Sequence, residues 1–117
     1  MDIKISAQGL RLEDDTEAFV HEQLYSALQR FEEQVVAADA FLKDINGPKG
    51  GIDKQVLLRV RLRNRQVIAI EITRASLRAA VVVATRKAKR AVRRSVKKAQ
   101  QRHKWRLGAG LREAAET

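Results

Sequence analysis

The sequence contains no cysteine, one proline and few aromatic residues: three Phe, one Tyr and one Trp among 117 positions. The absence of cysteine excludes disulfides, zinc–thiolate sites, iron–sulfur clusters and a thiol nucleophile. Because aromatic side chains are scarce, the core has to be built mainly from Val, Ile, Leu and Ala. At 13.2 kDa, the chain is large enough for one domain with its own core, and we expect no second full domain.

Long apolar runs are also missing from the sequence. No run approaches the roughly 20 residues that a membrane-spanning helix needs. The first ten residues, MDIKISAQGL, lack the basic and apolar regions of a signal peptide. We therefore expect a cytoplasmic protein.

Acidic residues are absent from positions 72–112, where 14 Lys and Arg occur. Residues 1–71 carry 10 basic and 12 acidic residues, so the net charge of +10 originates in the C-terminal part of the chain. Such a one-sided charge concentrates polyanions near the protein and speeds encounter with them. Nucleic acids and membrane surfaces are both candidate partners.

Four segments alternate apolar and polar residues, which predicts strands with one buried face. They cover residues 2–7, 35–44, 55–63 and 66–73. In the second segment, the residues expected to share the buried face are Val36, Ala38, Ala40 and Leu42. Glycine and proline residues between the second and third segments predict a long hairpin loop.

Two helices complete the expected order β-α-β-β-β-α. The first is expected to run from Asp14, as N-cap with Glu17 three residues later, to about Glu33. The second is long, with Thr73 or Ser76 as its cap. This order predicts an α+β fold in which both helices cover one face of an antiparallel-rich sheet. We expect the domain to span residues 1–103, followed by a flexible tail at 104–117, where periodicity is lost and glycine appears.

The second helix is amphipathic, with Ala and Val on one side and basic residues on the rest. The basic residues expected to bind RNA are Arg86, Lys87, Lys89, Arg90, Arg93, Arg94, Lys97 and Lys98. Several pairs lie four positions apart, such as Arg90 and Arg94, where like charges destabilise a helix. A helix face that is merely solvated would mix in acidic residues, so the pattern favours polyanion binding.

The apolar stripe of this helix lacks the Trp, Phe or Leu that a membrane-surface helix uses, which favours nucleic acid over lipid. Arg59, Arg61 and Arg63 provide a second basic row on the open face of the sheet, with Phe41 as a possible neighbour. No zinc finger, RNA-recognition signature or helix-turn-helix is evident. Binding to folded RNA through phosphates and shape fits this pattern best.

The loop NGPKGG has two possible interpretations. It lacks the Gly-Lys-Ser/Thr ending and the following helix of a phosphate-binding P-loop. It is therefore either a plain hairpin connection or an RNA-backbone contact made through Lys49, Lys54 and glycine amides.

No residue pattern indicates an enzyme, and we expect no metal, cofactor or small-molecule substrate. His21 and His103 are isolated, and helix capping accounts for the acidic cluster after residue 13. Trp105 lies between Lys104 and Arg106 and could either pack back on the core or stack on a base.

Over about residues 1–103, the chain resembles the family of ribosome hibernation-promoting factors and ribosome-associated inhibitors, once called sigma-factor modulation proteins. The resemblance rests on the order of elements, the segments MDIKISAQG, ALQRFEE, DINGPKGGIDK and VLLRVRL, and the basic last helix. It is closest to short members with an NGPKGG loop. At His21, Glu22 and Gln23, this chain lacks the lysine pairs that the family often carries.

The resemblance implies a fold similar to the double-stranded-RNA-binding domain. It also implies docking on the small ribosomal subunit, in the channel for mRNA and tRNA, which blocks initiation and protects idle ribosomes. The family's ribosomal-RNA contacts fall here on Lys87, Lys89, Arg90, Arg93, Arg94, Lys97 and Lys98. Two alternatives remain: a general binder of duplex RNA or DNA acting off the ribosome, and a homo-oligomeric interaction module. A weak homodimer is also possible.

Overall fold

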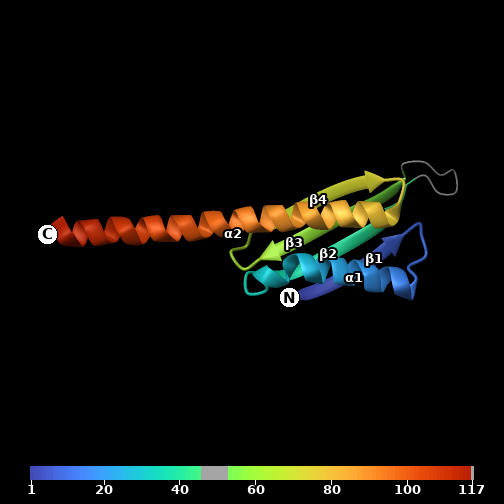
Figure 1. Cartoon of the computed structure of the whole chain (residues 1–117), viewed down its shortest axis with the longest axis horizontal. Helices are drawn as coiled ribbons and strands as arrows, with labels where there is room; N and C mark the ends of the chain where they lie inside the picture. The colour runs from blue at the N-terminus through green and yellow to red at the C-terminus, as the bar shows by residue number, and fades with distance from the viewer. Residues whose placement is uncertain (46–52, 117) are drawn as a thin grey trace.

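The computed structural model describes residues 1–45 and 53–116, and the side chains of the described residues up to Trp105. Its elements are β1 (Asp2–Gln8), α1 (Asp14–Leu28), the 3₁₀ turn η1 (Gln29–Phe31), β2 (Val35–Asp44), β3 (Lys54–Leu62), β4 (Val67–Arg74) and α2 (Leu77–Glu116) (Figure 1). The order β-α-β-β-β-α is the predicted one. Within the described residues, no helix is both long and apolar enough to span a membrane.

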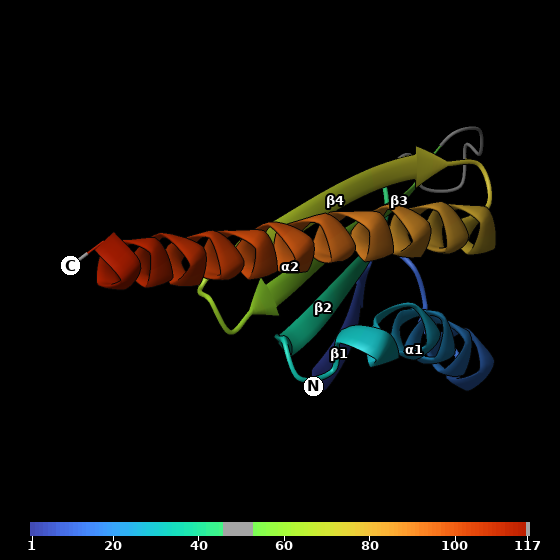
Figure 2. The ribbon, with the colours of Figure 1, turned by 60° about the vertical axis from the view of Figure 1, so that its left-hand side comes forward.

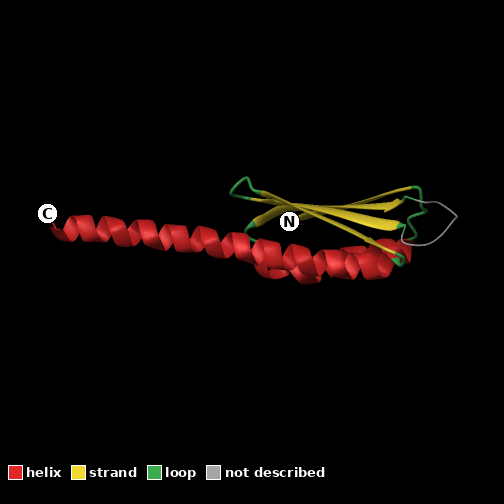
Figure 3. Ribbon diagram, turned by 90° about the horizontal axis from the view of Figure 1, so that it is seen from above, coloured by secondary structure: helices red, strands yellow, loops and turns green. Residues whose placement is uncertain are grey.

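The four strands form one sheet in the order β1-β2-β3-β4. β1 pairs with β2 in parallel, and β2, β3 and β4 pair antiparallel. The parallel pair requires a crossover, which α1 provides. Both helices lie on the same face of the sheet, as Figure 3 shows. α1 lies over β1 and β2, and α2 over β3 and β4 (Figure 2). The predicted α+β architecture is therefore confirmed.

The core between sheet and helices is almost entirely aliphatic. Its fully buried members on the helices are Val20, Leu24, Leu28, Ala80, Val81, Ala84, Ala88 and Val92. On the sheet they are Val35, Ala38, Ala40, Leu42, Val56, Leu58 and Val60. The alanines of α2 allow its backbone to approach the sheet closely, because an alanine places only a methyl group between the helix backbone and the sheet. Aliphatic packing of this kind is what the scarcity of aromatic residues predicts.

The sequence prediction for β2 was wrong at Val36. Its side chain is 44% exposed, whereas its neighbour Val35 is buried. The pairing of β2 with β3 shifts register between Val35 and Ala37. A bulge adds one residue to a strand and reverses the alternation on one side of it. Val35 therefore occupies the buried position that strict alternation assigns to Val36.

The helix boundaries differ in part from those predicted. α1 has Glu13, not Asp14, at its N-cap, with no side-chain cap hydrogen bond, and it ends at Leu28, not near Glu33. At the start of α2, the backbone N–H of Ala79 donates to Oγ of Ser76 at 3.3 Å, so of the two proposed caps the structure has Ser76. Side-chain capping therefore defines the start of α2 but not of α1.

α2 continues past residue 103, after which a flexible tail without periodicity was expected, and finishes at Glu116. Its C-terminal part projects beyond the sheet (Figure 1), and the longest dimension of the molecule is 71 Å. Residues 102–116 are rich in Arg, Leu, Ala and Glu, which favour helix without any packing partner, although each glycine opposes it by about 1 kcal/mol. Amphipathic periodicity reports packing, so it stops where contact with the sheet stops. The flexibility expected for residues 104–117 stays a prediction.

Gly9 follows β1 in a left-handed backbone conformation, with φ of +77°. A Cβ atom at this position would lie 3.0 Å from the backbone oxygen of Asp44, at the end of β2. Both the conformation and the close approach require glycine here. The turn after β1 is thereby fixed against the end of the neighbouring strand.

Candidate nucleic-acid interface

The eight basic residues predicted on α2 are all exposed to solvent. Among the described residues, the ion pairs all involve Lys54, so no basic residue of α2 is neutralised by a carboxylate. The helix contains no acidic residue before Glu113. Its like charges repel one another along one surface, and that repulsion is relieved when phosphates approach. We call this exposed set, from Arg86 to Lys98, the basic face of α2.

Four members of the basic face line a shallow hollow of about 270 Å³: Arg90, Arg93, Arg94 and Lys97. Their spacing of i, i+3, i+4 and i+7 places them on one side of the helix over two turns. Guanidinium groups present several N–H donors in a fixed plane and bind phosphate oxygens in pairs. The hollow is therefore suited to a phosphate group of a nucleic-acid backbone.

Contacts on the other side of α2 fix the orientation of the basic face. Ala84, Ala88 and Val92 are fully buried against the sheet. The Ser95 hydroxyl donates a hydrogen bond to Oε1 of Gln66, which joins the helix to the β3–β4 turn. Near the helix start, the guanidinium of Arg78 lies 4.6 Å from the ring centroid of Phe19 on α1. The basic face consequently points away from the sheet along the part of α2 that packs on the sheet.

The second predicted basic row does not join the first. Arg59 and Arg61 are exposed on β3, on the face of the sheet opposite the helices, and Arg63 lies in the turn that follows. The core separates the side chains of Arg59 and Arg61 from α2, whereas Arg63 lines a cavity together with residues of α2 such as Val96. Asp39 on β2 lies directly opposite Arg59, so the open face mixes both signs of charge. Phosphate binding by this row stays a prediction, and it would occur at a separate surface.

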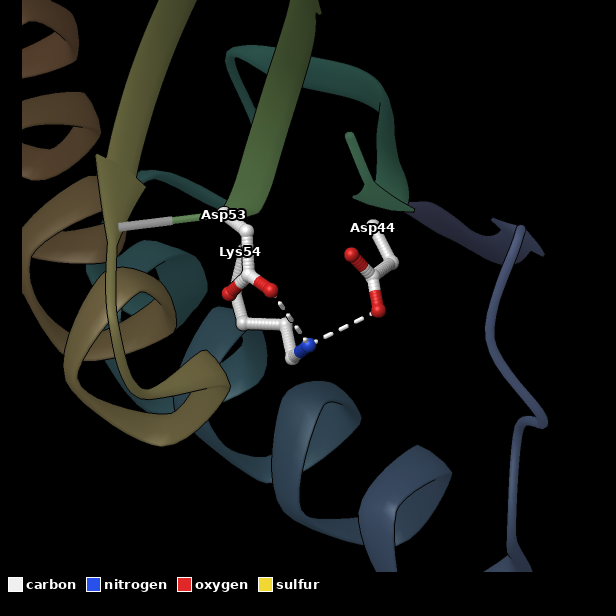
Figure 4. Close-up of polar contacts among 3 residues, drawn as sticks. All are labelled: Asp44, Asp53 and Lys54. Carbon is white, nitrogen blue, oxygen red and sulfur yellow. Dashed lines mark hydrogen bonds and ion pairs between the residues drawn. The ribbon is translucent and has the colours of Figure 1, made fainter. Parts of the chain in front are cut away.

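Lys54, predicted as a possible RNA contact, lies between two carboxylates at the start of β3 (Figure 4). Its Nζ atom is 2.8 Å from Oδ2 of Asp44 and 3.3 Å from Oδ2 of the buried Asp53. The hydrogen bond to Asp44 is the main cause that raises the pKa of Lys54, with Asp53 adding to it. The ammonium therefore compensates local negative charge. Lys49, the other loop residue predicted to contact RNA, lies outside the described residues.

The side of the molecule formed by α1 is acidic. Asp14, Asp15 and Glu17 are exposed in its first turn, and Glu22 is exposed one turn further. Within the described residues, no group of three or more acidic or histidine side chains could hold a metal ion. α1 lies beside α2 (Figure 2), so the two helices on this face of the sheet differ in the sign of their exposed charge.

Trp105 does not pack on the core, which was one of its two predicted roles. Its side chain is 75% exposed on the projecting part of α2. The straight helix carries it beyond the end of the sheet, so the chain cannot bring it back to the core. Stacking on a base stays a prediction.

The structure also contains a cavity that the sequence did not suggest. It has a volume of about 310 Å³ and lies between the end of η1, the β3–β4 turn and α2. Its lining includes Gln34, Leu62, Val96 and His103. These residues come from three segments distant in sequence, so no local pattern could have brought them together.

The fold is that of a small α+β domain, and its last helix carries exposed basic residues with no carboxylate partner among the described residues. The family model described as sigma 54 modulation protein / S30EA ribosomal protein matches residues 3–100. The chain therefore belongs to this family, as the sequence resemblance indicated. Comparison with curated proteins finds no match.

Two solved structures share the fold. The N-terminal domain of Protein Y from Thermus thermophilus has 22% sequence identity and a TM-score of 0.67, with 80% of this chain and 98% of that chain covered. A ribosomal subunit interface protein from Coxiella burnetii has 13% identity and a TM-score of 0.70, with 83% and 99% covered. At these identities the similarity establishes the architecture.

Proposed function

We propose that the protein is a non-catalytic, ribosome-associated RNA-binding protein. In this proposal it docks on the small subunit, in the channel used by mRNA and tRNA, and inhibits translation or promotes ribosome hibernation. The observation that carries the proposal is the basic face of α2, where eight exposed Lys and Arg have no carboxylate partner among the described residues. Family membership and a structural neighbour described as a ribosomal subunit interface protein support the choice of partner.

Ribosomal RNA supplies the dense phosphate array that such a helix face fits. In A-form RNA, phosphates and 2′-hydroxyls are accessible, while the deep major groove hides the base edges. A helix with many cations and no aromatic side chain on its basic face reads shape and phosphate spacing. Such binding suits a fixed RNA surface of defined geometry.

The acidic side formed by α1 orients the protein in this complex. Phosphates attract α2 and repel the exposed carboxylates at Asp14, Asp15, Glu17 and Glu22. The contact is then made mainly by α2, without the help from the first helix that a lysine pair near Glu22 would provide. A cytoplasmic location follows from the proposed partner.

Sedimentation of the full-length protein with ribosomes tests the proposal. The wild type is expected to co-sediment with small subunits or whole ribosomes at physiological salt and to be released at high salt, because phosphate contacts weaken as salt rises. The double variant Arg93→Glu, Arg94→Glu is expected to remain at the top of the gradient. A wild-type protein that stays at the top at physiological salt contradicts ribosome association.

The matched control is Arg11→Glu, Arg30→Glu. Both residues are exposed and lie outside α2 and the sheet. Each double variant lowers the net charge by four, from +10 to +6. If net charge alone drives association, the two variants fail equally; if the basic face is the docking surface, only the α2 variant fails. Equal affinity for ribosomes and for any free duplex would instead indicate a general duplex binder.

A further inference from the structure

The open face of the sheet carries an exposed aromatic ring that the proposed function does not use. Phe41, in the second half of β2, is 44% exposed on the side away from both helices. Its neighbours across the strands are Ser6 on β1 and Leu57 on β3. Ser6 is small, so one side of the ring is uncrowded, while Leu57 provides an apolar support on the other.

The ring is part of the lining of a cavity of about 440 Å³. The open-face side chains that line it are Ser6, Gln8, Phe41, Lys43, Gln55 and Leu57. The volume lies within the range of small-ligand sites, which is roughly 300–1,000 Å³. The lining combines an apolar floor with amide groups at its rim, and no residue in it is acidic.

The amide of Gln55 is held in one orientation at this rim. Its Nε2 atom donates to Oε1 of Glu71 on β4 at 2.6 Å. This leaves the carbonyl oxygen of Gln55 as an acceptor beside the cavity. The amide of Gln8, exposed at the end of β1, supplies both a donor and an acceptor on the other side. Amide groups of this kind match the mixed donors and acceptors on the edge of a nucleobase.

Basic residues flank the cavity. Lys43 is two residues from Phe41 on the same face of β2. Arg59 on β3 and Lys4 on β1 are the diagonal neighbours of Phe41, at roughly 7–8 Å between backbones. Asp39 on β2 and Glu71 on β4 are acidic residues on the same face, so the local balance is three positive charges against two negative. That balance favours an anionic ligand.

We propose that the open face of the sheet is a second nucleic-acid site, in which an unpaired nucleotide of single-stranded RNA stacks on Phe41. Lys43 and Arg59 contact the phosphates on either side of the stacked base, and the amides of Gln8 and Gln55 bind its edge. Only an unpaired base offers its face to an aromatic side chain, because paired bases are stacked within the duplex. The site therefore differs in substrate from the basic face of α2, which fits phosphates of folded RNA.

The two surfaces lie on opposite sides of the molecule, with the sheet and core between them (Figure 3). Occupation of one does not block the other. The protein could thus hold a single-stranded segment on the sheet while α2 contacts a structured RNA. This proposal does not depend on ribosome docking, and it is tested without ribosomes.

The test measures binding of a single-stranded oligouridine or oligoadenine of four nucleotides by the full-length protein labelled with ¹⁵N. The probe is expected to shift the backbone amide signals of β1, β2 and β3 near Phe41. Phe41→Ala is expected to weaken binding roughly 5- to 100-fold, the usual effect of removing one stacking ring. Phe41→Trp is expected to retain affinity, because it restores a stacking surface.

Val67→Ala is the matched control, since Val67 is 52% exposed on the same face but outside the cavity. It is expected to bind as the wild type does. All measurements are repeated in the Arg93→Glu, Arg94→Glu background, so that a weak contact with α2 does not mask the sheet site. Wild-type affinity of Phe41→Ala in that background, or shifts confined to α2, would overturn the proposal. If the sedimentation experiment shows no association with ribosomes, the outcome of this oligonucleotide test is unaffected.

Discussion

The Nζ atom of Lys54 lies 2.8 Å from Oδ2 of Asp44, which joins the first residue of β3 to the last residue of β2. The neighbouring carboxylate of Asp53 is buried and lies 3.3 Å from the same nitrogen. A buried carboxylate is costly unless a cation and hydrogen bonds compensate it. The lysine at this end of the hairpin is therefore held in place by the fold.

The stability of the protein should depend on the charge of Lys54 at alkaline pH. Its pKa is raised above the ordinary value of 10.5, chiefly by the hydrogen bond to Asp44. A raised pKa for a lysine means that its contribution is present at neutral pH and is lost as the pH rises through the folded-state pKa. The difference in free energy of unfolding between wild type and Lys54→Met should therefore shrink above pH 10.5. Denaturant unfolding at a series of pH values measures it.

Lys43→Met provides the control for this pH series, because Lys43 is exposed on the adjacent strand and forms no ion pair in the described structure. At neutral pH it should lower the free energy of unfolding less than Lys54→Met does, because it removes the same charge without breaking an ion pair. A Lys54→Met difference that persists at the most alkaline pH at which the wild type folds would contradict the ion-pair interpretation.

Ala88 should not tolerate a larger side chain. It is fully buried where α2 packs on the sheet, so Ala88→Leu forces the helix and sheet apart and should lower the free energy of unfolding by about 1–3 kcal/mol. Ala99→Leu makes the same change on an exposed part of the same helix and should have an effect within about 0.5 kcal/mol. Thermal or denaturant unfolding compares the two. Equal effects would indicate that helix propensity, not packing, decides the outcome.

Gly9→Ala should destabilise the protein by about 1–3 kcal/mol. The reasons are the left-handed backbone at φ of +77° and the 3.0 Å approach that its Cβ would make to the oxygen of Asp44. Gln8→Ala, one residue earlier and exposed, should stay within about 0.5 kcal/mol of the wild type. Unfolding in urea gives both values. A neutral Gly9→Ala would mean that the turn relaxes into another conformation.

The salt dependence of duplex-RNA binding should report the basic face of α2 directly. Arg94→Gln removes one phosphate contact in the hollow and should reduce the slope of log affinity against log salt by about one. Arg30→Gln, which lies in η1, should leave the slope unchanged. Fluorescence anisotropy at several salt concentrations measures the slope. Identical slopes for both variants would place the phosphate contacts elsewhere.

Local pattern was sufficient to predict most of the fold. Alternation over residues 55–63 predicted a strand with one buried face, and in β3 that face carries the buried residues Val56, Leu58 and Val60. It failed at Val36, where a bulge shifts the register, since a bulge depends on pairing with β3 and leaves no mark on β2 alone. The helical structure of residues 104–116 was not predicted either, because the helix there has no packing partner and therefore no amphipathic period.

The candidate site was predictable where one element carries it. The basic residues of α2 follow from helical spacing, and all eight are exposed as expected. The position of Arg59 and Arg61 on the open face was also predicted, because alternation along β3 places them opposite the buried side chains that face the helices. In contrast, the ion pair between Lys54 and Asp44 could not be predicted from the local sequence, because Asp44 is ten residues away across the hairpin.

The burial of α2 ends long before the helix does. Its last fully buried residue is Val92, Val96 is partly buried, and every described residue from Lys97 to Trp105 is exposed. Folding thus imposes few requirements on which side chains occupy this stretch. Charge reversal in this stretch should therefore leave the core intact, so a loss of RNA binding on such a change reports the binding surface and not unfolding.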